Sequence, residues 1–424
     1  MNKNIFLKGE LYINYLGPFS SLLGNLIATP ILISNLGIKE WSLFALINIL
    51  LPLVTLVLAG KGFFMSRLMI NIFLGNEKTK KSIDMFYKQE QKIFARCIIS
   101  IIFLSICLFL LNSNNYSSFE KIGLTFFLIS IAVFIKIFEQ FYAYLLNGLK
   151  EHYKLQVSGS IVTISKWALV VYLSLQNDIK INTLIISLII FSLLLIIVQK
   201  LYLLNYFKNK KNKFTYLNKN SISDFNEKNF DVIFFLILLL LQFYNVLIFG
   251  ILDPIKISYF AIALMISTSI GLIYSPLIGY LVPEINEKGE IRSKGRIKYF
   301  LNLIIKQFIV LLSILLFANL FLEEILYLWM GNSLNLKEIS NFLIPLSICV
   351  LAKELLGTLK ILYVAENKIN FMKNPVLLAF FICIVLTISI FLKVITPLIY
   401  LYCGSFLILT LTLYFYFIFF KKIN

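Results

Sequence analysis

Residues 183–206, TLIISLIIFSLLLIIVQKLYLLNY, form an almost wholly apolar block, and the stretch that follows, FKNKKNKFTYLNKNSISDFNEKN at 207–229, is polar and basic. A helix rises 1.5 Å per residue, so about 20 residues cross the roughly 30 Å hydrocarbon core of a bilayer. The apolar block therefore has the length and composition of a transmembrane helix. The basic stretch after it has the composition of a loop outside the membrane.

The same alternation of apolar block and charged break recurs along all 424 residues. Apolar residues make up 59% of the chain and charged residues 14%, against about 25% charged residues in ordinary soluble domains. We therefore expect an all-α polytopic membrane protein, which excludes a soluble enzyme, a disordered chain and a secreted disulfide scaffold. The pattern predicts twelve transmembrane helices, at 11–33, 42–64, 93–111, 122–146, 157–175, 183–206, 230–251, 258–282, 299–322, 339–364, 373–392 and 397–420.

The basic stretch at 207–229 divides these helices into six and six. We expect an N-terminal six-helix bundle at 1–206, a cytoplasmic basic linker at 207–229 and a C-terminal six-helix bundle at 230–424. The loops after the fourth and tenth helices, NGLKEHYKLQ and AENKINFMKN, are both short and basic, which favours two pseudo-symmetric halves. Two such halves flanking a site near the bilayer midplane are typical of secondary transporters.

The distribution of basic residues predicts the orientation of the chain. Of the 39 Lys and Arg residues, 27 fall on the side that carries both termini and 6 fall in the opposite loops. Cytoplasmic loops carry the excess of Lys and Arg, so both termini are predicted to be cytoplasmic.

Composition also bears on other classes of function. The net charge of +18 lies in short loops and not along one continuous stripe, so we expect no nucleic-acid partner. His152 is the only histidine, and the five cysteines form no CxxC pair, so we expect no metal site. No Walker A, HExxH or GxSxG motif is present, so we predict no ATP site, no other cofactor and no enzymatic activity.

Charged residues inside predicted helices are the first candidates for a functional site, because a central Lys costs about 2.5–3.5 kcal/mol on insertion scales. In the helix at 122–146, Lys136 and Glu139 are three residues apart and share a face. Lys166 adds a third charge in the helix at 157–175.

The helix at 339–364 carries a second set. Lys353, Gly357 and Lys360 follow one stripe, with Glu354 at its edge. Lys353 lies as deep in its helix as Lys136 does in the matching helix of the first half.

Two interpretations of these charges stay open. In the first, Lys136–Glu139 and Lys353–Glu354 are ion pairs that only stabilise the bundle. In the second, a water-filled central cavity lined by cations binds an anionic substrate. An unpaired buried charge costs several kcal/mol, so a purely structural network should contain equal numbers of Lys and Glu. The second interpretation explains why Lys residues outnumber Glu residues here. Glu139 and Glu354 are also the candidates for ion coupling.

Polar residues in the other helices could line the same cavity or form ordinary hydrogen bonds between helices. Amide side chains would suit a ligand that carries sugar. The candidates are Asn14, Asn25, Asn48, Gln242 and Asn245.

One long stretch, ATPILISNLGIKEWSLFALINILLPLVTLVLAGKGFFMSR, resembles the start of the bacterial polysaccharide flippases, the Wzx-type O-antigen transporters of the multidrug/oligosaccharidyl-lipid/polysaccharide exporter superfamily. The family often has an Asp two residues before Gly60, where this chain has Leu58. The residues that carry the resemblance are Pro30, Leu36, Gly37, Trp41, Phe44, Gly60, Arg67, Pro283, Trp329 and Gly331.

The resemblance implies a flippase that moves an undecaprenyl-diphosphate-linked O-antigen or related repeat unit from the cytoplasmic to the periplasmic leaflet of the bacterial inner membrane. Transport would proceed by alternating access and be driven by an ion gradient. The polysaccharide polymerase and the chain-length regulator are candidate partners. The cations that would meet the diphosphate are Lys136, Lys166, Lys353, Lys360 and Arg67.

Three alternatives remain open on the sequence alone. A peptidoglycan-precursor or teichoic-type flippase would share the mechanism and differ in cargo. A drug exporter of the same superfamily would have to accept cationic drugs in a cationic cavity. An O-antigen polymerase or ligase would resemble proteins with a large periplasmic loop rich in Arg and His, and here the long loop is cytoplasmic by the charge rule.

Overall fold

The structure of the chain is a computed structural model. The described backbone covers the following ranges: 3–57, 79–112, 119–148, 152–176, 180–210, 227–249, 251–272, 294–331, 335–365 and 369–421.

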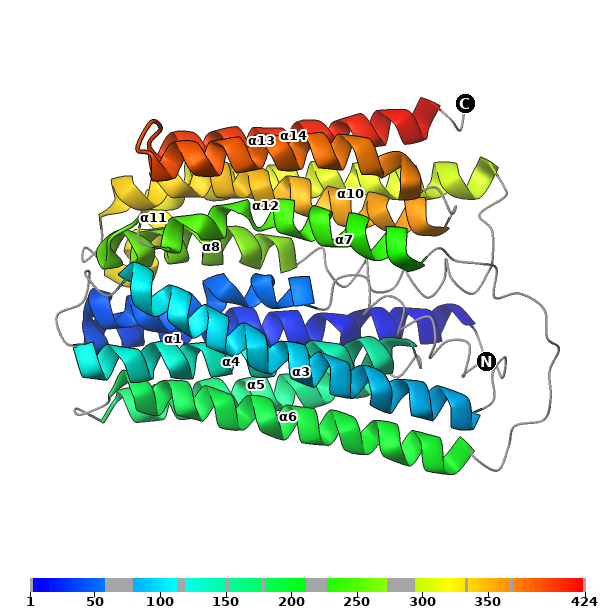
Figure 1. Ribbon diagram of the computed structural model, residues 1–424, viewed down its shortest axis with the longest axis horizontal. Helices are drawn as coiled ribbons and strands as arrows, with labels where there is room; N and C mark the ends of the chain where they lie inside the picture. The colour runs from blue at the N-terminus through cyan, green and yellow to red at the C-terminus, as the bar shows by residue number, and fades with distance from the viewer. Residues whose placement is uncertain are drawn as a thin grey trace. The chain divides into compact units, whose positions relative to one another are not determined.

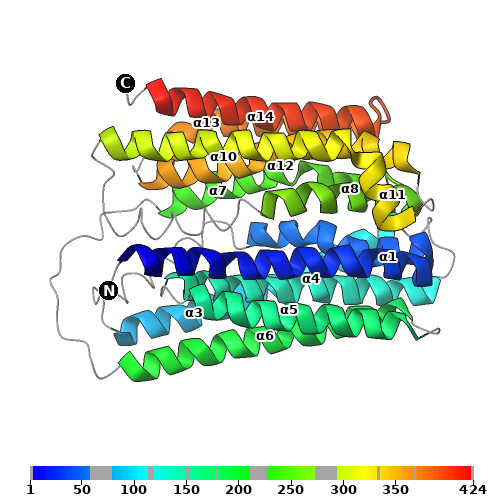
Figure 2. The same ribbon diagram turned by 180° about the vertical axis from the view of Figure 1, so that it is seen from behind.

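The chain folds into two compact units, Met1–Asp231 and Val232–Asn424. Every regular element in the described ranges is a helix. Within each unit, Figures 1 and 2 show long helices lying side by side with their axes roughly aligned. Unit 1 contains α1 (Lys3–Val57), α3 (Thr79–Asn112), α4 (Phe119–Gly148), α5 (His152–Ser174) and α6 (Ile181–Lys210). Unit 2 contains most of α7 (Glu227–Leu241), then η2 (Phe243–Ile248), α8 (Pro254–Leu272), α10 (Lys294–Leu320), α11 (Leu322–Met330), α12 (Leu336–Ala365), η4 (Ile369–Met372), α13 (Lys373–Phe391) and α14 (Pro397–Lys421).

Eight helices in the described ranges are long and apolar enough to cross a membrane, or up to nine if one bent pair counts as a single span. The described helices lie where the apolar blocks predict them, which makes the chain a multi-pass helical membrane protein. The number twelve and the cytoplasmic position of both termini stay predictions.

Helix α1 contains the first predicted helix and the described part of the second, and its helical backbone is interrupted only at Gly37. This residue has φ 78° and ψ 159°, a conformation that only glycine adopts readily. In Figures 1 and 2 the segment after this point runs back toward the other end of unit 1. Gly37 therefore turns one continuous stretch of helix into a hairpin.

Helix α4 is at the centre of unit 1, because it packs against α1, α3 and α6 and also touches α5. Large side chains of α4, including Phe126, Phe141 and Tyr142, are fully buried. Residues on this helix are therefore held by neighbours on several sides.

Helix α12 has the corresponding place in unit 2 and packs against α8, α10 and α14. Leu351 on α12 packs with Leu311 and Leu315 on α10. One predicted helix of this unit is broken, because the block at 230–251 changes from α7 to a 3-10 helix after Leu241. The predicted helix at 299–322 is present as α10, which bends by 69° at its end into the short α11, a helix that the sequence did not predict.

Two side-chain hydrogen bonds lie at the break after α7. The Asn245 Nδ2 donates to Gln242 Oε1 at 2.9 Å, and the Tyr400 hydroxyl donates to the Phe243 carbonyl oxygen at 2.8 Å. The Tyr400 bond engages a backbone carbonyl at the break, while the Asn245 bond joins two side chains within one turn. The apolar pattern of the sequence carries no signal for such contacts, so it predicts one unbroken helix.

Candidate functional site

Lys136 and Glu139 form an ion pair on α4, with Lys136 Nζ donating to Glu139 Oε2. Both side chains are largely buried, at 25% and 21% exposed. The spacing of three residues places the two groups on one face of the helix, as the sequence predicts. This pair lies within the candidate span Gly123–Ala143.

Lys166 on α5 lies close enough to this pair for its charge to be repelled by Lys136 and attracted by Glu139. Its Nζ sits 4.6 Å from the ring centroid of Trp167, which is a cation–π contact. In the described part of the chain Lys166 forms no ion pair. The structure thus gathers Lys136, Glu139 and Lys166 into one group, which we call the charged cluster.

Trp167 fixes one wall of the charged cluster. A Cβ placed on Gly24 would lie 1.9 Å from Trp167 Cδ1, so the indole lies directly on the backbone of α1. The ring of Phe44 packs edge-on against it at 6.4 Å between centroids. Because α1 holds the indole on both sides of Gly37, the position of the neighbouring Lys166 is determined by packing.

The charges of the cluster do not balance. Lys136 and Lys166 contribute two positive charges and Glu139 contributes one negative charge. Lys136 and Glu139 neutralise each other, while Lys166 is left with an aromatic ring, a contact worth about 0.5–2 kcal/mol. The cluster therefore has one more basic group than acidic groups.

Unit 2 positions Lys353 and Glu354 on α12, both half-buried. Lys353 forms no ion pair among the described residues, and its charge acts on Cys349 one turn before it. Glu354 approaches α8, where its Oε1 lies 3.4 Å from the position that a Cβ on Gly271 would take. Lys353 and Glu354 thus have separate surroundings although they are adjacent in sequence.

The predicted amide residues are scattered. Gln242 and Asn245 are buried and bond to each other at the α7 break, with Asn245 Oδ1 left without a partner in the described structure. Asn25 is half-buried and Asn48 is exposed, both on α1.

Several predicted site residues are described only in part. Arg67 lies outside the described residues. Lys360 and Asn14 lie in the described backbone of α12 and α1, but their side chains are outside the described set.

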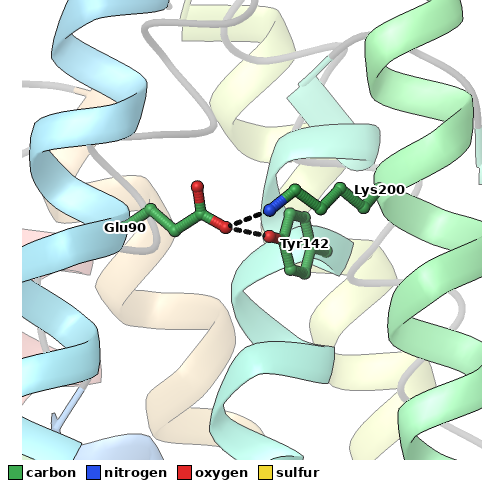
Figure 3. Close-up of polar contacts among 3 residues, drawn as sticks. All are labelled: Glu90, Tyr142 and Lys200. Atoms are coloured by element: carbon green, nitrogen blue, oxygen red, sulfur yellow. Dashed lines mark hydrogen bonds and ion pairs between the residues drawn. The ribbon is translucent and has the colours of Figure 1, made fainter.

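A second polar group in unit 1 was missed by the sequence reasoning. Glu90 Oε1 on α3 accepts bonds from the Tyr142 hydroxyl on α4 and from Lys200 Nζ on α6, the latter at 2.9 Å (Figure 3). Lys200 falls inside the predicted helix at 183–206, but it was also counted among the 27 basic residues on the side of the termini and was not considered for a site. The available signal was a Glu just before the predicted helix at 93–111 and a Lys near the end of the predicted helix at 183–206, on the same predicted side.

No family model and no curated protein matches the sequence. Solved structures do match. The eukaryotic MATE transporter AtDTX14 aligns with a TM-score of 0.65 at 13% identity, over 96% of this chain and 94% of that one. The lipid II flippase MurJ, in an inward closed conformation, aligns with a TM-score of 0.61 at 16% identity, over 96% of this chain and 87% of that one. An inward-facing multidrug resistance MATE family transporter of the MOP superfamily aligns with a TM-score of 0.64 at 15% identity, over 97% of this chain and 98% of that one.

These likenesses cover nearly the full length of each chain, so this chain has the fold of the MATE and MurJ transporters of the MOP superfamily. The fold agrees with the superfamily that the sequence resembles, and membership of that superfamily and of its O-antigen family both stay predictions.

Proposed function

We propose that this membrane transporter is a flippase that moves an undecaprenyl-diphosphate-linked O-antigen or related polysaccharide repeat unit. The cargo passes from the cytoplasmic to the periplasmic leaflet of the bacterial inner membrane. Transport proceeds by alternating access and uses an ion gradient, since the sequence has no Walker A motif.

Lys166 is the single observation that carries this proposal. It lies in the candidate span Val157–Ser174 and has no carboxylate of its own among the described residues. A cation inside a membrane normally pairs with an acidic group or marks the path of a substrate. A diphosphate would supply the missing negative charge, and the ammonium group would bind its oxygens by charge-assisted hydrogen bonds.

The surroundings of Lys166 favour an anion over a cationic drug. Lys136 raises the positive potential at the site, and Glu139 is already engaged by Lys136. A cationic drug would meet like charges there and would be disfavoured. A lipid-linked glycan with a diphosphate therefore suits the charged cluster better than a cationic drug does.

A peptidoglycan-precursor flippase is the second candidate, because one solved structure with this fold is described as a lipid II flippase. Its cargo and the O-antigen repeat share the diphosphate, so the charged cluster fits both. The two candidates differ in the sugar that accumulates when the transporter is lost.

Deletion of the gene tests the proposal. Lipid-linked saccharides are extracted from the deletion strain and identified by mass spectrometry, alongside the surface polysaccharide. Accumulation of an undecaprenyl-diphosphate saccharide with loss of surface polysaccharide supports the O-antigen assignment. Accumulation of peptidoglycan precursor supports the second candidate, and unchanged lipid-linked saccharides contradict both.

A further inference from the structure

A short helix of unit 2, α11, follows the long α10 at an angle of 69°. We propose that α11 is an amphipathic helix that lies in the headgroup region of the bilayer and binds phospholipid there. Its partner is the surface of the lipid leaflet in which α10 ends. This role is independent of the cargo that the protein transports.

Helix α10 is long enough to cross the hydrocarbon core without α11. From residue 299 to Leu320 it rises about 33 Å at 1.5 Å per residue, against a core of about 30 Å. The chain has therefore reached the surface of the core where α11 begins. Transmembrane helices are tilted by about 20° on average, so a helix at 69° to such a span lies closer to the membrane plane than to its normal.

The bend between the two helices is a packed feature. The rings of Phe317 and Phe321 lie across it with 4.5 Å between their centroids. Past the bend, the Ile325 backbone N–H donates to the Phe321 carbonyl oxygen at 3.0 Å, so the helical pattern resumes at once. Gly331, with φ 66°, ends α11. The direction of α11 and the faces that it presents are thus fixed by local contacts.

One stripe of α11 faces the protein and a second apolar stripe is open. Leu322 and Leu326 are 3% and 0% exposed, and α11 contacts both α10 and α12. Phe321, Ile325 and Leu328 follow one another at i, i+4 and i+7, which places them on a neighbouring stripe. Within that stripe Phe321 is 43% exposed and Leu328 is 85% exposed.

The open apolar stripe continues the exposed apolar surface at the end of α10. Phe317 and Leu320, in the last turn of α10, are 58% and 77% exposed. Side chains of this kind on a membrane-crossing helix face lipid, since they would be costly in water. The stripe on α11 begins at Phe321, the next residue, so lipid is the occupant that suits both surfaces.

The remaining side of α11 is polar. Glu323 and Glu324 are exposed, and carboxylates in the first turn of a helix are stabilised by its dipole. Glu323 lies about 140° around the helix from Leu328, because the five residues between them turn about 100° each. Tyr327, one turn after Glu323, is also exposed, and tyrosine is enriched where membrane meets water. A helix with one apolar and one polar side suits this interface.

A second element at the same end of unit 2 has a similar composition. In Figures 1 and 2 the turn between α13 and α14 lies at the end of unit 2 that carries α11. In this turn Leu392 and Val394 are 69% and 72% exposed, and the exposed Lys393 stands between them. Apolar side chains beside a Lys that can extend its ammonium group into water are typical of a membrane surface. The surface of the leaflet therefore fits two separate elements of unit 2.

Photo-cross-linking of the full-length wild type in nanodiscs, at one copy per disc, tests the position of α11. One phosphatidylcholine probe carries a diazirine near its glycerol and another carries it at the end of an acyl chain. Mass spectrometry should find at least about fivefold more adducts on α11 with the first probe. Equal or greater labelling by the chain-end probe would show a helix that re-enters the core, and no labelling by either probe would show a helix in water. Each of these results would overturn the proposal.

Cysteine labelling tests the two sides of α11 separately. Leu328→Cys and the matched control Glu323→Cys are treated in nanodiscs with a charged maleimide that does not enter the bilayer. The labelling rate at each position is read from its own peptide, which separates it from the native cysteines. Glu323→Cys should react at least about tenfold faster than Leu328→Cys, and the two should react equally after unfolding in detergent.

The same labelling distinguishes lipid from a second copy of the chain. Slow labelling of Leu328→Cys in discs that hold one copy supports lipid as the occupant. Equal rates at the two positions would overturn the proposal. Slow labelling of Leu328→Cys only in discs that hold two copies would assign the apolar stripe to a contact between copies, and would also overturn it.

Discussion

The Tyr400 hydroxyl on α14 donates a 2.8 Å hydrogen bond to the carbonyl oxygen of Phe243, where α7 gives way to η2. The two residues are 157 positions apart in the chain. Gly404, one turn after Tyr400, leaves room for the Phe243 ring, since a Cβ there would lie 2.1 Å from it. Helix α14 is thus shaped to receive the break in its neighbour.

Removal of the Tyr400 hydroxyl should destabilise unit 2. Tyr400→Phe keeps the ring but leaves a buried carbonyl without its donor, which costs about 1–3 kcal/mol. The melting temperature of the purified protein in detergent should fall. Tyr402→Phe is the matched control, because Tyr402 on the same helix stacks on Phe406 through its ring. This variant should have the melting temperature of the wild type.

Two glycines in unit 1 should respond in opposite ways to alanine. At Gly24 a methyl group would collide with Trp167, so Gly24→Ala should cost about 1–3 kcal/mol of stability. At Gly159 on α5 a Cβ meets nothing within 4 Å, so Gly159→Ala should be neutral or stabilise by up to about 1 kcal/mol. Thermal unfolding of the two variants compares them directly, and equal melting temperatures would contradict the packing described for Trp167.

Reporter fusions test the orientation of the chain. Fusions after Lys208 and Lys294 should report the cytoplasm, and fusions near Asn114 and Asn332 should report the periplasm, because the Lys and Arg excess predicts these sides. A reversal of either pair would show that the predicted number of helices is wrong.

The apolar blocks predict the described helices well because bilayer thickness sets their length. The hairpin in α1 also falls where the blocks at 11–33 and 42–64 leave a gap, at Gly37. The break after Leu241 was not predictable, since the hydroxyl that bonds to it belongs to Tyr400, a residue far along the chain. Apolar content cannot reveal a hydrogen bond made by a distant partner.

The candidate site could be predicted only in part. The Lys136–Glu139 pair follows from helical spacing alone, and the structure shows it. The approach of Lys166 to that pair depends on how α5 packs, which Trp167 and Gly24 determine. The Glu90–Lys200 pair was hidden because charges near predicted helix ends are ordinarily assigned to loops.

Replacement of Lys136 should separate charge from geometry. Lys136→Ala should abolish surface polysaccharide with normal protein levels in the membrane, since Glu139, released from Lys136, would then neutralise Lys166. Lys136→Arg should retain part of the activity, because the charge survives in a different shape. Loss of the Ala variant from the membrane would instead favour a purely structural ion pair.

Binding of undecaprenyl diphosphate to the purified protein in nanodiscs tests the central claim most directly. The wild type should bind this lipid more tightly than uncharged undecaprenol, and Lys166→Met should weaken diphosphate binding by at least about tenfold, or about 1.4 kcal/mol. Lys180→Met, at an exposed position before α6, is the matched control and should bind as the wild type does. Equal affinity of the wild type and Lys166→Met for undecaprenyl diphosphate would contradict the account.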